Sequence, residues 1–123
     1  VPAGKTYDRP VISTDIFATI HAAAGAPKPK GKYVDSYDLL PYLTGKHKED
    51  PHEWLYWRQS HKTAFRIGDM KIVRQTPKQW ELYDLAKDPS ETKDLIKEQP
   101  EQFKLLLEGL EKINNHMVEP LFK

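Results

Sequence analysis

The strongest constraint on the fold is an apolar stripe near the carboxyl end of the chain. Its members recur at the i, i+3, i+4, i+7 spacing of one helix face: Phe103, Leu106, Leu107, Leu110, Ile113 and Met117. Pro100 suits the first turn of such a helix. Because burying each large apolar side chain favours folding by ~1.5–3 kcal/mol, we expect a helix over 99–117 that covers another apolar surface.

That surface is predicted upstream, where short aromatic-rich segments alternate between apolar and polar residues. Four of them are typical of strands, namely 54–59, 63–67, 70–74 and 80–85. Gly68-Asp69 is a two-residue hairpin signal, since glycine readily adopts a positive φ. We therefore predict an α+β fold: a four-stranded antiparallel sheet packed by a carboxyl-terminal helix and preceded by a short helical segment.

The first third of the chain carries the signals of that helical segment. Ser13 or Thr14 is expected to cap a helix whose first turn contains Asp15, where the helix dipole favours an anion. A second helical turn is expected to end at Gly45. The two pieces share an apolar face made of Ile16, Phe17, Ile20, Leu39, Leu40 and Leu43. We divide the chain into a connecting helical segment, 1–45, and a small α+β subdomain, 46–123.

Composition argues against several classes of function. The 123 residues carry 19 Lys and Arg against 18 Asp and Glu, which gives no electrostatic case for nucleic acid or for an anionic membrane surface. No stretch approaches the ~18 apolar residues that indicate a membrane-spanning helix. Since the chain has no cysteine, disulfides, thiolate metal sites and a cysteine nucleophile are excluded.

One run carries a family signature. Residues 80–95 read WELYDLAKDPSETKDL, an alternating strand closed by Asp88-Pro89, which extends neither a strand nor a helix. This pattern resembles the signature near the carboxyl end of sulfatases. Four further segments are similar to sulfatase elements in the same order, namely 11–25, 34–45, 54–58 and 64–73. The chain therefore resembles the smaller carboxyl-terminal subdomain of the sulfatase family, within the alkaline phosphatase-like superfamily.

The resemblance implies that the chemistry belongs to a larger amino-terminal domain. Sulfatases hydrolyse sulfate esters with a formylglycine, made from Cys or Ser in a C/S-x-P-x-R motif, beside a calcium ion. No serine of this chain begins that motif. We therefore expect no catalytic residue, metal or cofactor here, with calcium and formylglycine in a full-length parent. The first residues read as the middle of a loop, so we expect a piece of a longer protein, whose partners are its amino-terminal catalytic domain and a sulfated small molecule or glycan.

Residues around the first predicted hairpin are the candidate substrate contacts: Trp57, Arg58, His61 and Lys62. Trp57 and Arg58 could stack on a sugar and pair with its sulfate. His61, beside Lys62, could contact an anionic substrate. The alternatives are a core tryptophan next to a solvent-facing arginine, and an exposed polar turn.

Two polar clusters suggest metal sites less strongly. His47 and His52 flank two acidic residues, but their spacing fits no helical i, i+4 pair, and a solvated linker explains the tract better. The acidic residues between 84 and 91 only loosely resemble a calcium loop, because the glycine of the sharp turn is missing. Capping of the following turn by Asp88 or Ser90 is the better explanation.

Two other functions stay open. The same subdomain would suit a phosphodiesterase or phosphonate hydrolase of the superfamily, in which a bare Thr or Ser replaces the C/S-x-P-x-R motif. A free-standing binding module is the alternative of a different class. If the apolar face of 1–45 is not covered by another domain, it favours self-association, since large exposed apolar patches are uncommon in monomers.

Overall fold

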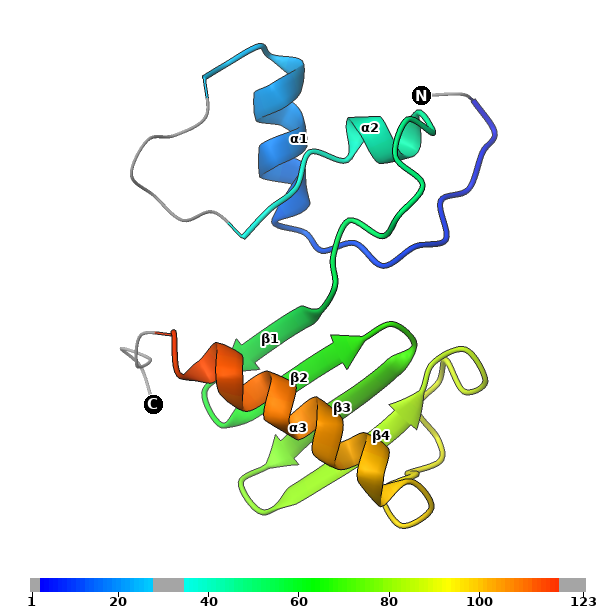
Figure 1. Cartoon of the computed structure of the whole chain (residues 1–123), viewed down its shortest axis with the longest axis vertical. Coiled ribbons are helices and arrows are strands. Elements are labelled where there is room, and N and C mark those ends of the chain that lie inside the picture. The colour runs from blue at the N-terminus through cyan, green and yellow to red at the C-terminus, as the bar shows by residue number, and fades with distance from the viewer. Residues whose placement is uncertain (1–2, 28–34, 118–123) are drawn as a thin grey trace. The chain divides into compact units, whose positions relative to one another are not determined.

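The structure, a computed structural model, describes residues 3–27 and 35–117. The chain divides into two compact units between Glu53 and Trp54. The first unit contains helices α1 (Asp15–Ala23) and α2 (Leu40–Leu43). The second contains strands β1 (Leu55–Gln59), β2 (Lys62–Ile67), β3 (Met70–Thr76) and β4 (Gln79–Asp84), followed by helix α3 (Pro100–Asn114) (Figure 1). The predicted α+β fold is confirmed.

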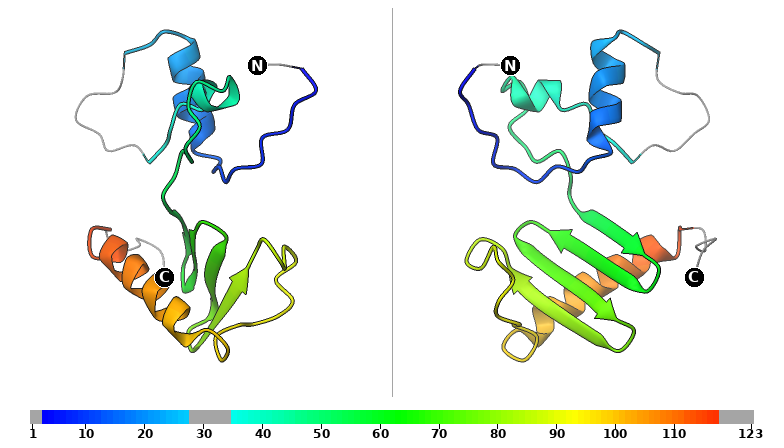
Figure 2. Two further views of the ribbon diagram at one scale, coloured as in Figure 1. Left: turned by 45° about the vertical axis from the view of Figure 1, so that its right-hand side comes forward. Right: turned by 180° about the vertical axis from the view of Figure 1, so that it is seen from behind.

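The sheet of the second unit is an antiparallel meander in the order β1-β2-β3-β4. Gly68 has a φ of 56° and makes the turn between β2 and β3, as the sequence predicts. Phe65 pairs with Ile72, and Ile72 with Leu82, so these side chains form one row across three strands. Helix α3 lies across the face that carries this row (Figure 2).

The core of the second unit lies between α3 and the sheet. Its buried members are Phe65, Ile72, Leu82, Leu106 and Leu110. A Cβ atom at Gly109 would lie 3.0 Å from the Phe65 ring, so a glycine at this position lets α3 approach the sheet closely. The predicted stripe is therefore confirmed from Phe103 to Ile113, with Leu107 only half-buried, whereas Met117 lies beyond the end of α3 at Asn114.

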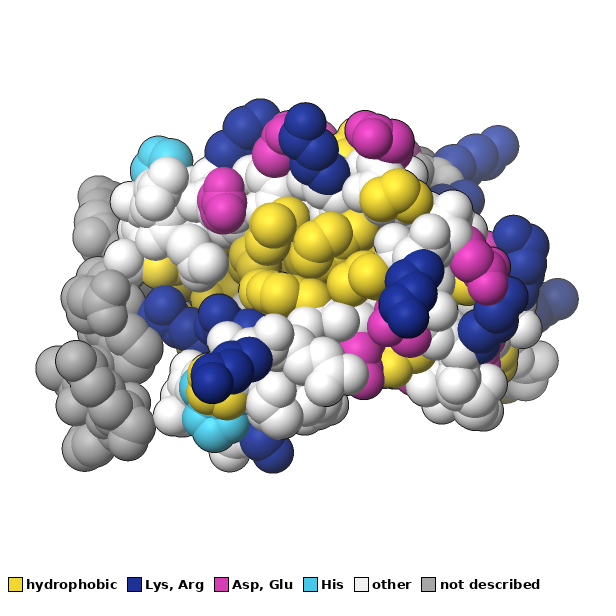
Figure 3. Space-filling model, turned by 90° about the horizontal axis from the view of Figure 1, so that it is seen from below, with side chains coloured by type: hydrophobic (Ala, Val, Ile, Leu, Met, Phe, Trp, Pro, Cys, Tyr) yellow, Lys and Arg dark blue, Asp and Glu magenta, His cyan; other side chains and the backbone are white. Residues whose placement is uncertain are grey.

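Partly buried apolar side chains surround this core: Tyr56, Ile67, Met70, Trp80, Leu95, Ile96, Phe103, Leu107 and Ile113. The rings of Trp80 and Phe103 pack with their centroids 6.3 Å apart. Figure 3 shows a face on which hydrophobic side chains gather in the middle, with charged side chains around them.

The segment after β4 folds back along that strand. The backbone N–H of Leu95 donates to the carbonyl oxygen of Leu82 at 2.8 Å, and the Asp94 carboxylate accepts the N–H of Leu82 at 3.0 Å. The Asp88 carboxylate accepts the backbone N–H groups of Thr92 and Lys93 at 2.7 and 2.9 Å. Asp88 therefore caps the turn before Leu95, as predicted.

Helix α1 begins without a side-chain cap, so the prediction that Ser13 or Thr14 caps it is wrong. Thr14 already has helical φ and ψ angles, −62° and −25°, and its hydroxyl donates to the carbonyl oxygen of Asp35 at 3.0 Å. The first amides, of Asp15, Ile16 and Phe17, donate instead to backbone carbonyls three residues earlier. A tight backbone turn therefore satisfies the groups that a capping side chain usually satisfies.

The division between the units lies later in the chain than the expected boundary after Gly45. Arg9 forms an ion pair with Asp50, and His52 contacts Asp15. Residues 46–53 therefore group with the first unit. None of the described helices is long and apolar enough to cross a membrane.

Candidate functional site

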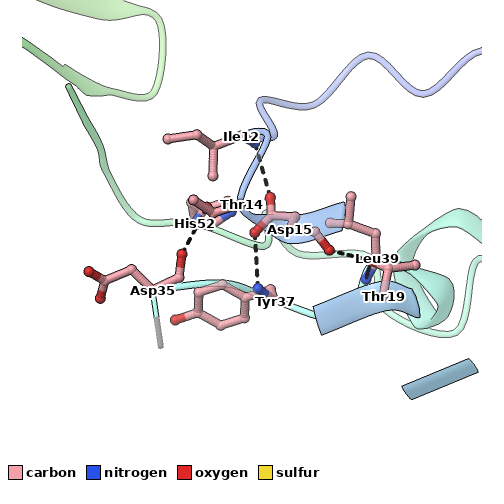
Figure 4. A network of polar contacts seen from close by, with 8 residues as sticks. All are labelled: Ile12, Thr14, Asp15, Thr19, Asp35, Tyr37, Leu39 and His52. Atoms are coloured by element: carbon pink, nitrogen blue, oxygen red, sulfur yellow. Dashed lines mark hydrogen bonds and ion pairs between the residues drawn. The ribbon is translucent and has the colours of Figure 1, made fainter. Parts of the chain in front are cut away.

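A single buried carboxylate, that of Asp15, organises the described part of the first unit. The Asp15 side chain is 0% exposed and accepts the backbone N–H groups of Ile12 at 3.0 Å and Tyr37 at 2.9 Å. It also lies 2.7 Å from Nε2 of His52 (Figure 4). Because an ionised carboxylate only accepts hydrogen bonds, Nε2 of His52 is the donor. These three donors offset the large cost of removing the carboxylate from water.

The network continues one turn along α1. The Thr19 hydroxyl donates to the carbonyl oxygen of Asp15 at 2.7 Å and accepts the N–H of Leu39 at 3.0 Å. The ring of Tyr37 meets the His52 ring edge-on, with centroids 4.8 Å apart. Residues 35–39 are therefore held along one side of α1.

The interpretation of His52 as part of a solvated linker is wrong. Its side chain is 9% exposed and bonded to Asp15, which lies 37 residues earlier in the chain. No local spacing signals such a contact, so the sequence pattern missed it. The one local sign of burial was that His52 follows a proline, Pro51, which is itself buried.

The Asp15–His52 pair resembles the orienting half of a hydrolytic site, but the structure supports a structural role. Such a pair activates a hydroxyl only when the other imidazole nitrogen reaches one. Among the described residues no hydroxyl bonds to His52, and those of Thr14 and Thr19 donate to backbone carbonyls. The pair therefore ties distant segments of the first unit together.

The predicted substrate contacts lie around the first hairpin of the sheet. Trp57 and Arg58 are neighbours on β1 and project to opposite faces of the sheet. Trp57 pairs with Ala64 on the face away from α3 and is 39% exposed, so its interpretation as a core residue is wrong. Arg58 pairs with Thr63, on the face that carries Phe65. The two side chains therefore do not grip a ligand as a couple from one face.

His61 and Lys62 are exposed and lie where β1 turns into β2. The carbonyl oxygen of His61 accepts a hydrogen bond from Nε of Arg74 at 3.2 Å. The strand register puts Lys62 on the same face as Trp57 and at a diagonal to it, a distance that long side chains bridge. The strand register thus places Trp57 and Lys62 on one face of the sheet and Arg58 on the other, with His61 in the adjoining turn. Substrate contact stays a prediction for each.

Arg74, on the neighbouring strand β3, contacts this hairpin but was not among the predicted substrate contacts. Its guanidinium lies over the ring of Trp80, 5.1 Å from the ring centroid, and its Nη2 donates to Oγ1 of Thr63 at 3.4 Å. Together with the bond to His61, these contacts attach the turn to β3 and β4. The arginine therefore fixes the shape of the hairpin.

The acidic residues after β4 are occupied by structural contacts. The Lys87 ammonium donates to the Asp84 carboxylate at 2.8 Å and holds the pKa of that carboxyl below its usual value. Lys71 donates to Glu91 at 2.6 Å, and Asp88 caps the following turn. Within residues 3–27 and 35–117 no cluster of three or more His, Cys, Asp or Glu side chains is placed to hold a metal ion.

Sequence comparison relates part of the chain to known enzymes. Human steryl-sulfatase is 41% identical over 56 residues, which cover 46% of this chain and 10% of that protein. The steryl-sulfatase of Rattus norvegicus is 34% identical over 53 residues, which cover 43% of this chain and 9% of that protein. The matched part of the chain thus spans about a tenth of the length of these curated relatives. No protein-family model matches.

Structure comparison extends the similarity over most of the chain. BT33336S-sulf, solved in work on glycosaminoglycan metabolism by Bacteroides thetaiotaomicron, is 28% identical, with a TM-score of 0.65 over 82% of this chain and 24% of its own. Ps i-CgsB in complex with k-i-k-neocarrahexaose is 25% identical, with a TM-score of 0.75 over 91% of this chain and 26% of its own. A protein bound to its substrate D-glucosamine-2-N,6-O-disulfate shares the fold, with a TM-score of 0.63 at 21% identity.

Proposed function

Because this chain belongs to the sulfatase family, we propose that it is the small carboxyl-terminal subdomain of a sulfuric ester hydrolase. The observation that carries this proposal is the agreement of two independent similarities. One is the 41% identity to human steryl-sulfatase, and the other is the fold shared with BT33336S-sulf at 28% identity. The five sequence elements in sulfatase order support the same assignment.

Within that enzyme the chain serves as scaffold, and the reacting groups lie elsewhere in the polypeptide. Formylglycine and calcium are expected in the larger part of the protein. The acidic residues after β4 support this placement of the reacting groups, because their carboxylates already bind lysines or backbone amides. These residues are Asp84, Asp88 and Glu91. The Asp15–His52 pair supports the same placement, since it binds backbone groups of its own unit.

A second contribution is one wall of the substrate site. Trp57 and Lys62 share one face of the sheet, where an indole ring and an ammonium group can engage a sugar ring and a sulfate. His61, in the adjoining turn, adds a further polar group. The substrate class that suits these groups is a sulfated small molecule or glycan.

The test compares the full-length protein with the 123-residue chain on a generic aryl sulfate and on an aryl phosphodiester. We expect the full-length protein to hydrolyse the sulfate ester and the chain alone to hydrolyse neither, since we expect the activated nucleophile in the larger part of the protein. Turnover by the chain alone would overturn the scaffold role. Hydrolysis of the phosphodiester in place of the sulfate ester would overturn the reaction class.

Substitutions in the full-length protein test the wall. Trp57→Ala and Lys62→Ala are expected to raise KM with little change in kcat, because they remove binding made in ground and transition states alike. Lys104→Ala, which removes an exposed lysine from α3 on the opposite side of the sheet, is the matched control. Equal kinetics for all three variants would remove the hairpin from the substrate site.

A further inference from the structure

Helix α1 turns its apolar side outward. Ile16, Phe17 and Ile20 are 60%, 52% and 63% exposed, whereas Asp15 on the same helix is 0% exposed. A surface helix normally buries its apolar stripe and leaves its polar side to water. In α1 the arrangement is reversed.

Hydrogen bonds fix this reversed orientation. At the spacing of about 3.6 residues per turn, Asp15 and Thr19 share one side of the helix, and the exposed apolar residues lie around the other side. Asp15 and Thr19 hold the backbone amides of Tyr37 and Leu39, so residues 35–39 cover the polar side. Rotating α1 to bury its apolar side would leave these buried groups without partners, which is costly.

The exposed side, which we call the outer face of α1, consists of Ile16, Phe17 and Ile20. These residues are neighbours at i, i+3 and i, i+4 and carry no charge. Val11, just before the helix, is also exposed at 43%. The described part of the first unit leaves this face open, and such apolar patches usually mark an interaction surface.

We propose that the outer face of α1 docks onto an apolar, uncharged surface of the larger, catalytic part of the same polypeptide. The inference rests on the proposed function and names the contact that joins the subdomain to the enzyme. Charge-free contact areas are typical of permanent interfaces rather than transient ones. The outer face thus belongs to the interior of the complete protein.

The lengths of the similar proteins identify this occupant. The matched region covers 24% of BT33336S-sulf and 26% of Ps i-CgsB, so about three quarters of each of these proteins lies outside it. The similarity to Ps i-CgsB covers 91% of this chain, so it includes most of the first unit. The first unit therefore recurs in proteins that carry a large further segment able to cover the face.

The experiment uses the full-length protein with Phe17→Glu and Ile20→Glu combined. Two carboxylates in an apolar contact are strongly unfavourable, so the first 53 residues should be released from the rest. Proteolytic cleavage within them, mapped by mass spectrometry, is expected to accelerate by about tenfold or more, which corresponds to ~1.4 kcal/mol of lost protection. Leu105→Glu is the matched control, because Leu105 is similarly exposed at 54% but lies on α3.

The conservative pair Phe17→Leu and Ile20→Val should keep the original cleavage rate. Equal rates for the double glutamate variant and the Leu105→Glu control would overturn the proposal. So would a full-length dimer that the glutamates convert to monomer in sedimentation, since a second copy would then cover the face. Cleavage does not depend on turnover, so an accelerated rate in a protein that hydrolyses no sulfate ester would refute the proposed function and leave the docking surface standing.

Discussion

Truncation of one core leucine tests the packing of the second unit. Leu106 and Leu105 are adjacent on α3, yet Leu106 is 0% exposed and Leu105 is 54% exposed. Replacing either by alanine changes helix propensity equally, so that contribution cancels in the comparison. The difference between the two variants therefore reports burial alone.

The expected loss follows from the surroundings of Leu106. Three carbons leave an apolar site, at ~0.8 kcal/mol each, which gives about 2.4 kcal/mol. A residual void of roughly 60 Å³ adds about 1.5 kcal/mol at ~24 cal/mol per Å³. The site cannot collapse easily, because the Phe65 ring already lies close to Gly109. We expect Leu106→Ala to lower the free energy of unfolding by about 4 kcal/mol and Leu105→Ala by less than about 0.5 kcal/mol.

Urea denaturation followed by tryptophan fluorescence measures this difference. All three tryptophans, Trp54, Trp57 and Trp80, belong to the second unit, so the signal reports its unfolding. If Leu106→Ala unfolds the unit outright, Ile72→Val replaces it, with an expected loss of about 0.5–1.5 kcal/mol. A loss below about 1 kcal/mol for Leu106→Ala, or equal losses at Leu105 and Leu106, would refute the packing described above.

Two further predictions concern buried and capping carboxylates. Asp15→Ala should speed amide exchange at Tyr37 by about tenfold or more, because an unsatisfied buried amide costs ~1–3 kcal/mol; exchange as slow as in the control Asp8→Ala would show that the carboxylate is dispensable. The backbone N–H of Lys93 lowers the pKa of Asp88 in the folded protein. The cap therefore stabilises the fold fully above the ordinary aspartate pKa of about 3.9. This stabilisation is lost as the pH falls through the lower pKa of the folded state. Asp88→Asn should therefore flatten the dependence of the melting temperature on pH in that acidic range, and an unchanged slope would count against the cap.

The second unit could be predicted from the sequence because its signals are local. The alternation of the strands, the glycine turn at Gly68 and the stripe of α3 each lie within a few residues, and the structure confirms them. Even so, the stripe alone did not separate buried Leu106 from half-buried Leu107. That distinction depends on where the helix meets Phe65 across the sheet.

The first unit was predicted less well because its contacts join distant segments. The bond between Asp15 and His52 spans 37 residues, and neither residue stands in a periodic pattern. The failed cap at Thr14 has a related cause, since its hydroxyl is held by Asp35. For the candidate site, strand alternation alone separates Trp57 from Arg58, but only the position of α3 decides which of them lies on the covered face.

The return of the chain along β4 also protects the sheet from misassembly. An edge strand with free N–H and C=O groups is a template for pairing with another chain. At Leu82 both groups are occupied, the N–H by the Asp94 carboxylate and the carbonyl by the N–H of Leu95. A foreign strand therefore finds no pairing partner at the centre of β4, and the run that carries the family signature acts here as a guard against aggregation.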